Sequence, residues 1–576
     1  MWNIGTTFNY DGWKDYKYAL THAKPDDGWL WFRLPGSLKD CLSNEKLKEL
    51  EWKVRSALDS DNTKQLVKEV FVDLWLSLET GFTKKQIETI VWNLDNFSHD
   101  LIVPIEGLSE NTYLLNESYG PTDAFKDLAL QMLTGLTSTI VSEENKVAVE
   151  KAKNWEKWQK LRFLVNLTST SWDTGPAGWK WVEGKPFIVN IIWLPANEST
   201  NGQIGQMAIL KWNVLALPMK EGFSDIQTSM ISWNTDEYKE ELVKVITDEF
   251  SDLITEYGFE IEVSSGSFNS INPGRIDGQM IYHTYWLLQA KAKWIIKQWE
   301  EIIEVIPSGN GWHVYGALQA RLLWKIDGPT IVTCNRNDTF YKIFETGRFQ
   351  KEVWNSVHQA SVSMIIEYPN NMIRLFSYAF WSERAKKISD DFFSWKEVVF
   401  SKDERSILKE KLNIHCYRVE SEDELSTVQK VFKETGRLIF PHTANAVKWL
   451  EEFRNTYKDY DTPALVSETA SPWKFLAATA AALECKISTL SLYNHYRKLE
   501  RTREWCLELI EKIKNQYDIY WYKFDENIIP KDLRDIYKNG YKVRETTSAA
   551  HFHNETLDFL KGYAPELRKQ VLKLLK

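Results

Sequence analysis

Apolar residues recur along the chain at two different spacings, and segments of the two kinds alternate. A spacing of three and four residues, with charged residues between, predicts helices over Lys46–Ser60, Thr63–Glu79 and Lys239–Tyr257, the last ending at Gly258. Short continuous apolar runs predict buried strands over Leu161–Leu167, Phe187–Leu194, Val214–Leu217, Ile302–Ile306 and Ile331–Cys334. Buried strands separated by helical segments indicate βαβ units and a parallel sheet, so the predicted fold class is α/β.

The pattern changes twice along the 576 residues, which are too many for one small core. We expect a mainly helical N-terminal domain over 1–100 and a catalytic region over 101–480. That region would contain a large and a small α/β subdomain, the small one covering roughly 161–280. Residues 481–576 would form a C-terminal helical extension, with a strand-like piece at Tyr517–Phe524.

Charge and composition exclude several classes of function. The formal net charge is −9 and no basic tract occurs, which argues against nucleic acid as a partner. We find no apolar run that could span a bilayer, and the first residues lack the pattern of a signal peptide. Five scattered cysteines without a CxxC pair indicate neither a disulfide framework nor a zinc site. These features predict a cytoplasmic protein without a metal.

Glycine and tryptophan are present in unusual proportion. The chain has 27 Trp and only 26 Gly, whereas glycine averages near 7% of residues. Tryptophan therefore stands at positions where a more ordinary sequence would have the conformationally free glycine.

One segment, Tyr119–Gln131, carries the candidate chemistry. It opens with a Gly-Pro turn and continues as a helix, so Lys126 falls in the first turns of that helix. A lysine there is usually a solvated surface charge. The other interpretation is an amine held against a carbonyl cofactor by an apolar neighbour.

The segment resembles the cofactor-lysine segment of the threonine synthases, whose pattern is GPTxAFKDxALQ. Further motifs of that family follow in the same order, at Phe268–Gln279, Ser308–His313, Asn335–Asp338, Pro441–Ala444 and Glu468–Phe475. The resemblance covers about residues 3 to 476. It implies a pyridoxal-phosphate (PLP) enzyme of fold type II, similar to the tryptophan synthase β subunit, with two open sheets flanked by helices.

The resemblance also implies roles for residues around the cofactor. Lys126 would form the internal aldimine and then move protons during catalysis. The phosphate would lie in a loop of backbone N–H groups at a helix start, and a hydroxyl would meet the pyridine nitrogen. The cofactor-binding residues implied are Lys126, Gly309, Asn310, Gly311, Trp312, His313 and, for the nitrogen, Thr469.

The substrate-binding residues implied fall in two groups. Ser171, Asp173 and Thr174 would bind the substrate carboxylate at a strand-to-helix turn. Asn269, Asn272 and Arg275 are candidates for the substrate phosphate, because the arginine fork matches phosphate oxygens. A surface arginine in a salt bridge is the alternative interpretation of Arg275.

The chain departs from the family at ligand loops. Tryptophan stands at three glycine-containing motifs, as Trp29, Trp172 and Trp312, and Thr7 replaces an arginine. The implied function is conversion of O-phosphohomoserine and water to threonine and phosphate, by a monomer or homodimer. One alternative is a threonine synthase-like phospho-lyase acting on O-phosphothreonine or O-phosphoserine. Another, of a different class, is a catalytically silent relative or a redesigned scaffold on the same fold.

Overall fold

The computed structural model describes most of the chain. The described residues are 5–6, 15–22, 30–32, 42–169, 173–195, 199–207, 213–220, 236–297, 301–324, 328–350, 359–366, 369–394, 396–457, 462–484, 489–500, 502–541, 547–548 and 551–576. Four residues discussed above, Thr7, Trp29, Ser171 and Trp172, lie outside these ranges.

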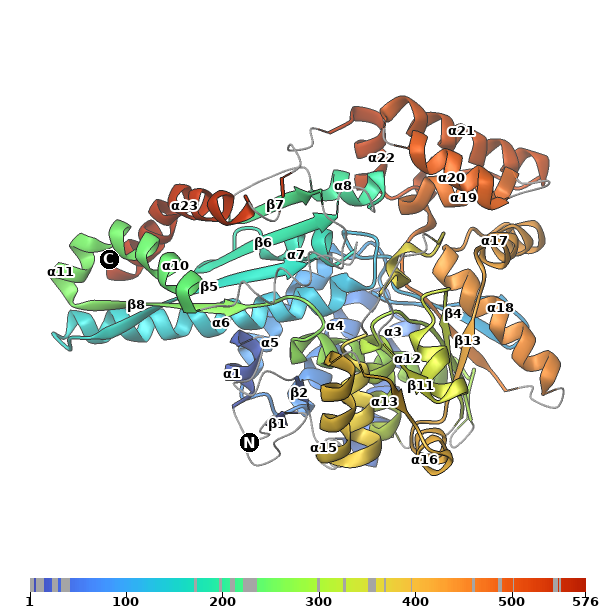
Figure 1. Ribbon diagram of the computed structural model, residues 1–576, viewed down its shortest axis with the longest axis horizontal. Coiled ribbons are helices and arrows are strands. Elements are labelled where there is room, and N and C mark those ends of the chain that lie inside the picture. The colour runs from blue at the N-terminus through green and yellow to red at the C-terminus, as the bar shows by residue number, and fades with distance from the viewer. Residues whose placement is uncertain are drawn as a thin grey trace.

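A six-stranded sheet forms one half of the molecule (Figure 1). Its strand order is β13-β10-β9-β14-β4-β3, and all neighbours are parallel except β3 and β4. The strands are β3 (Ile105–Ser109), β4 (Thr112–Asn116), β9 (Ile303–Pro307), β10 (Thr330–Cys334), β13 (Ile414–Arg418) and β14 (Ala464–Glu468). Every residue of β9, β10 and β14 is buried, as expected of the inner strands of a sheet covered on both faces.

A four-stranded parallel sheet forms the other half, in the order β7-β6-β5-β8. Its strands are β5 (Gln159–Ser169), β6 (Ile188–Pro195), β7 (Val214–Met219) and β8 (Phe259–Gly266). The helices packed against it are α6 (Lys126–Lys153), α7 (Thr174–Val182), α10 (Asp236–Glu249) and α23 (Phe552–Leu575). The chain therefore has two open sheets flanked by helices, as predicted.

The carboxyl ends of several strands point to one region between the sheets. β5 ends shortly before α7, β9 is followed by the loop that begins at Ser308, and β14 is followed by Thr469. In open α/β sheets, ligands bind outside these strand ends. Helices α12 (Pro273–Ala292) and α13 (Trp312–Trp324) pack against each other beside this region, and α18 (Pro441–Thr456) crosses β9, β10 and β14.

The N-terminal helices are α1 (Tyr16–Thr21), α3 (Asn44–Leu58), α4 (Thr63–Ser77) and α5 (Lys84–Val91). They share a buried cluster with α6, α12 and the four-stranded sheet, and Trp31 and Trp75 are among its largest buried side chains. A capping box begins α5, in which Thr83 and Gln86 bond each other's backbone N–H.

The C-terminal extension is helical, and its parts lie at two places (Figure 1). Helices α20 (Thr489–Leu499), α21 (Arg503–Ile519) and α22 (Lys531–Asn539) pack near α8 (Asn201–Met207), α17 (Ser421–Thr435) and α19 (Leu476–Glu484), while α23 packs on α10, α6 and β7. The strand predicted at Tyr517–Phe524 is wrong, because α21 continues to Ile519 and a turn follows.

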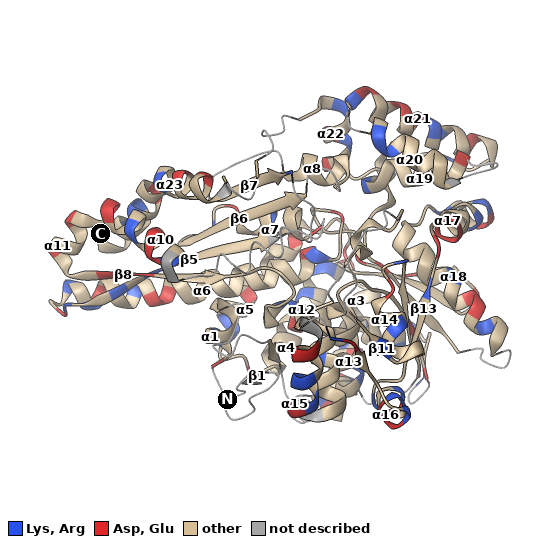
Figure 2. Cartoon of the chain, viewed as in Figure 1, with Lys and Arg blue, Asp and Glu red and all other residues tan. Residues whose placement is uncertain are grey.

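The smaller elements complete the described fold. They are β1 (Gly5–Thr6), β2 (Trp31–Phe32), α11 (Ser251–Tyr257), α14 (Thr339–Tyr341), β11 (Arg348–Phe349), α15 (Met372–Phe393), β12 (Val398–Val399) and α16 (Lys402–Leu412), with short 3₁₀ or π turns at Trp92–Asn96, Lys342–Thr346, Val362–Met364, Pro472–Phe475 and Glu526–Ile528. Figure 2 shows charged residues on outer helices such as α16, α17 and α21, whereas β6 and β7 carry none. Among the helices described, none is long and apolar enough to cross a membrane.

Candidate functional site

The segment that carries Lys126 is fixed by its own turn. Asp127 accepts hydrogen bonds from the backbone N–H and the hydroxyl of Thr122, both at 2.9 Å, and from the indole N–H of Trp181. Gly120 lies so close to Asp127 that a Cβ would come within 2.3 Å of its carboxylate. Glycine is therefore required at 120, and the turn places Lys126 at the first position of α6.

The same segment is also bound to the end of β14. The N–H of Phe125 donates to the carbonyl of Thr469 at 2.8 Å, and Ala124 pairs with Ala470 in an antiparallel bridge. Lys126 and Thr469 are thereby brought to one place from positions far apart in the sequence.

Lys126 opens onto a buried cavity with a volume of about 50 Å³. The cavity is lined by residues from both halves of the molecule: Phe125, Lys126, Asp173, Thr174, Asn269, Ser270, Arg275, Pro307, Ser308, Gly309, Asn310, Trp312, His313, Ser363, Met364, Ile366, Phe440, His442 and Thr469. Burial and the nearby Arg275 guanidinium lower the pKa of Lys126 well below its ordinary value. The site therefore favours the neutral, nucleophilic amine.

Several buried polar groups in this wall have no hydrogen-bond partner. Two guanidinium nitrogens of Arg275, Nε and Nη2, lack one, while Nη1 donates to the carbonyl of Phe268 at 2.6 Å. Both ring nitrogens of His442 also lack one, and burial lowers the pKa of His442 to about 3. Because buried polar groups are normally paired, these atoms indicate a site built for a polar ligand.

Asp173 is held by an ion pair inside the protein. Its carboxylate lies 3.0 Å from the ammonium of Lys474, and both side chains are at most 2% exposed. Gln203 and Ser363 also donate to Asp173. Burial alone would raise the pKa of Asp173, but the charge of Lys474 and the hydrogen bond from Gln203 hold it below its ordinary value.

The loop before α13 forms a second wall. The N–H of Gly311, at φ +80°, donates to the hydroxyl of Ser308 at 3.2 Å. Asn310 donates to Ser270, and Asn371 donates to the same hydroxyl, both at 3.0 Å. These bonds fix the loop so that the first N–H groups of α13 lie beside the cavity.

Most of the site residues predicted from the sequence meet in this cavity. The structure brings together Lys126, Asp173, Thr174, Asn269, Arg275, Gly309, Asn310, Trp312, His313 and Thr469. Asn272 and Gly311 do not line it. The side chain of Asn272 instead caps α12 at Gly274 and donates to the carbonyls of Leu20 and Ser267, and its role as a substrate ligand stays a prediction.

The predicted cofactor does not fit the cavity as a whole. Its phosphate would find the donors of Arg275 and of the start of α13. Its ring finds no space, because the indole of Trp312 stacks on Phe125 with centroids 5.0 Å apart and planes 19° apart. A ring inserted between them would need two carbon contact distances, about 7–8 Å. The free volume is also far below the roughly 300 Å³ at which ligand pockets begin.

The indole also contacts the groups that the ligand should meet. The Arg275 guanidinium carbon lies 4.5 Å from the centroid of Trp312, and Nζ of Lys126 lies 5.0 Å from it. Lys126 is at the same time 3.4 Å from the ring centroid of Phe125. Trp312 therefore occupies the space next to Lys126 in which a planar cofactor ring would lie.

Two residues that build this candidate site are not predicted from the sequence. Lys474 balances the charge of Asp173, and His442 presents two unpaired nitrogens to the cavity. Both belong to motifs that resemble those of the family, and those motifs were the available signal. Their partners lie far away in the sequence, so spacing alone does not reveal the pairs.

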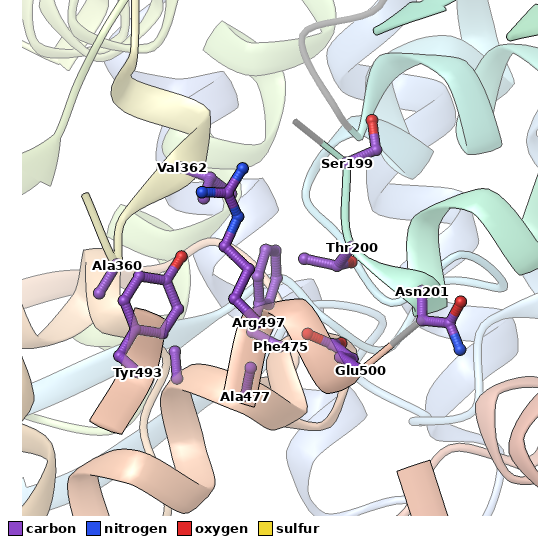
Figure 3. Close-up of a pocket in the computed structure, with 11 residues that line it drawn as sticks. Ser199, Thr200, Asn201, Ala360, Val362, Phe475, Ala477, Tyr493, Arg497 and Glu500 are labelled. Carbon is purple, nitrogen blue, oxygen red and sulfur yellow. The ribbon is translucent and has the colours of Figure 1, made fainter. Parts of the chain in front are cut away.

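A second cavity of about 10 Å³ lies where α8 meets α19 and α20 (Figure 3). Figure 3 shows the Arg497 side chain extending between Tyr493 and Phe475 toward Val362. None of the predicted site residues lines it. Among the described residues, no group of three or more His, Cys, Asp or Glu is placed to hold a metal ion.

Comparisons with known proteins agree with this fold. No family model matches the chain. The chain is 28% identical to the threonine synthase of Pseudomonas aeruginosa over 67% of its own length and 73% of that protein. It is 24% identical to threonine synthase-like 1 of Macaca fascicularis over 78% of its own length, a match that spans 57% of that relative.

Solved structures agree over nearly the whole chain. The PLP-bound threonine synthase from Brucella melitensis superposes with a TM-score of 0.70 at 20% identity, covering 98% of this chain and all of that one. The yeast threonine synthase gives 0.70 at 19% identity, covering 99% of each. Two open sheets with a helix-start lysine between them define the fold of the type II PLP-dependent enzymes. Within that class, the chain is similar in sequence and in fold to the threonine synthases.

Proposed function

We propose that this protein is a threonine synthase-like, PLP-dependent lyase that acts on a phosphorylated amino acid. The observation that carries the proposal is the buried amine of Lys126, whose pKa burial lowers, in a cavity with unpaired cationic and neutral donors. PLP would supply the electron sink of such a reaction. The residues expected to hold it are Lys126, Gly309, Asn310, His313 and Thr469. Trp312 must first leave the space for the ring.

The first substrate that we propose is O-phosphohomoserine, with threonine and phosphate as products. Arg275 supports this choice, because it is a buried guanidinium with two unpaired N–H-bearing nitrogens beside the cavity. The alternative substrates, O-phosphothreonine and O-phosphoserine, carry the same phosphate and differ in the position of the bond that breaks.

The second candidate is a catalytically silent relative. The position of Trp312 favours it, because the indole stacks on Phe125 in the ring space and contacts Arg275.

Product analysis separates these proposals. The protein and its Trp312→Gly variant are incubated with PLP and each phosphorylated amino acid, and Trp312→Gly/Lys126→Ala is the control. Threonine and phosphate from phosphohomoserine, lost in the control, support the first proposal. Release of 2-oxobutyrate from phosphothreonine without threonine formation supports the phospho-lyase. No product from any substrate with either protein contradicts both and leaves the silent relative.

A further inference from the structure

The described chain contains tryptophan in a backbone conformation that belongs to glycine. Ten non-glycine residues in the described ranges have positive φ, and four of them are tryptophans: Trp155 at 65°, Trp158 at 67°, Trp294 at 60° and Trp521 at 62°. Positive φ in a bulky residue is a genuine outlier, since the residues that tolerate it best are glycine and, less often, asparagine or aspartate. All four tryptophans are 74% to 94% exposed, so core packing does not force them into this conformation.

Three of these tryptophans follow helices at the same structural position. Trp155, Trp294 and Trp521 each come directly after the C-cap residue of α6, α12 and α21, respectively. At the end of α6, the N–H of Trp155 donates to the carbonyl of Ala152 at 3.0 Å, and the N–H of Glu156 donates to that of Lys151 at 3.1 Å. This pair of bonds defines the Schellman motif, whose left-handed residue is usually glycine.

The other two helices end in the same way. After α12, Trp294 donates to Lys291 at 3.1 Å, and Ile295 donates to Ala290 at 2.9 Å. After α21, Trp521 donates to Asp518 at 3.2 Å, and Tyr522 donates to Tyr517 at 2.9 Å. Glycine occupies the left-handed position at other helix ends of this chain, as at Gly258 and Gly436.

Trp312 joins this group through a different observation. Trp312 stands in the glycine-containing motif at Ser308–His313, which resembles the phosphate loop of the threonine synthases. The Trp312 indole is the group that closes the ring space beside Phe125 and Lys126. The composition is consistent with tryptophan at glycine positions. The chain has 26 glycines, whereas an average of 7% would give about 40, and tryptophan is in excess.

We infer that Trp155, Trp294, Trp312 and Trp521 stand at glycine positions, and that the polypeptide made by the source organism carries glycine there. One cause accounts for all four: a reassigned codon such as UGA, which is read as tryptophan in some genetic codes and as glycine in others. The consequence at the site is that glycine at 312 opens the ring space next to Lys126. This consequence, unlike the inference on the three helix ends, rests on the proposed function.

The direct test is peptide mass spectrometry of the protein isolated from its source, together with the codons of its gene. We expect glycine masses at 155, 294, 312 and 521, and UGA at these codons. We expect UGG at fully buried tryptophans such as Trp75 and Trp286. Tryptophan masses at the four positions overturn the inference.

A second test uses recombinant protein and does not depend on cofactor binding. We expect Trp155→Gly and Trp521→Gly to raise the melting temperature. Trp52→Gly is the matched control, because Trp52 is also exposed, at 66%, but lies inside α3, where glycine disfavours the helix. It should lower the melting temperature. A fall in all three variants contradicts the glycine positions.

The cofactor consequence has its own readout. PLP should quench the protein fluorescence of Trp312→Gly at lower concentration than that of Trp294→Gly, a control with the same substitution at the far end of α12. If the helix-end variants are stabilised and Trp312→Gly gains no affinity for PLP, the inference on the helix ends stands and the proposed function fails. If PLP binds Trp312→Gly but the helix-end variants are destabilised, the inference fails and the proposed function stands.

Discussion

Asp173 and Lys474 form a buried ion pair, and its loss should change the free energy of unfolding by a predictable amount. The substitution Lys474→Met keeps the length of the side chain and removes its charge. The ammonium nitrogen lies 3.0 Å from Asp173 and 2.7 Å from the carbonyl of Thr122, and neither charged side chain is more than 2% exposed. Removing one member of such a buried pair costs about 3–5 kcal/mol, because the remaining charge loses its partner without regaining water. We expect the free energy of unfolding to fall by that amount at neutral pH.

The pH dependence of the loss follows from the pKa of Asp173. In the native protein this pKa is held below its ordinary value, so the pair adds stability above the unfolded pKa of about 3.9 and loses it as pH falls further. Without Lys474 the buried carboxyl has lost its nearest cation, and its pKa should rise. The deficit of Lys474→Met should therefore be largest near neutral pH and shrink as Asp173 takes up a proton in acid.

Urea unfolding at neutral pH and near pH 5 measures both effects. The double variant Asp173→Asn/Lys474→Met is the control, because the asparagine removes the unpaired charge and should recover part of the loss. A loss below about 1 kcal/mol for Lys474→Met, or a double variant that is less stable still, would show that the pair does not stabilise the fold.

Two further predictions concern the packing and charge of the interior. Gly120→Ala should lower the free energy of unfolding in urea by about 1–3 kcal/mol, because its Cβ must displace the Asp127 carboxylate. Gly562→Ala, with open space around it in α23, should raise that free energy by up to about 1 kcal/mol. Equal effects of the two substitutions would contradict the contact between Gly120 and Asp127. Burial raises the pKa of Glu424 to about 8, so the folded protein retains a proton that the unfolded chain releases near pH 4.3. The free energy of unfolding should therefore fall as the pH rises from about 4.3 to about 8. Glu424→Gln should flatten the profile of melting temperature against pH, and an unchanged slope would contradict this role of Glu424.

Local patterns predicted the elements of the fold well where burial dominates. The apolar run Leu161–Leu167 lies within β5, and Thr63–Glu79 nearly coincides with α4. The helix predicted over Lys239–Tyr257 is divided, since Phe250 interrupts it between α10 and α11. Its apolar spacing continues through the break, so periodicity does not reveal it.

The sequence motifs predicted which segments form the candidate site, but they predicted less well which side chains contact each other there. Lys126 and Thr469 meet because Phe125 bonds the end of β14, a pairing that depends on the strand order. Asn272 belongs to the right segment, but its side chain is used to cap α12. The position of the Trp312 indole depends on Phe125 and Arg275, neither of which is its neighbour in the sequence.

We propose that Lys126 lies in a cofactor site and that Trp312 closes the space for the cofactor ring. The most direct measurement is reduction with borohydride in the presence of PLP, followed by peptide mapping of the labelled lysine. We expect a label on Lys126 in Trp312→Gly and none on Lys126 in the unsubstituted chain or in Trp294→Gly. Equal labelling of Lys126 in all three proteins, or no label on Lys126 in Trp312→Gly, would contradict it.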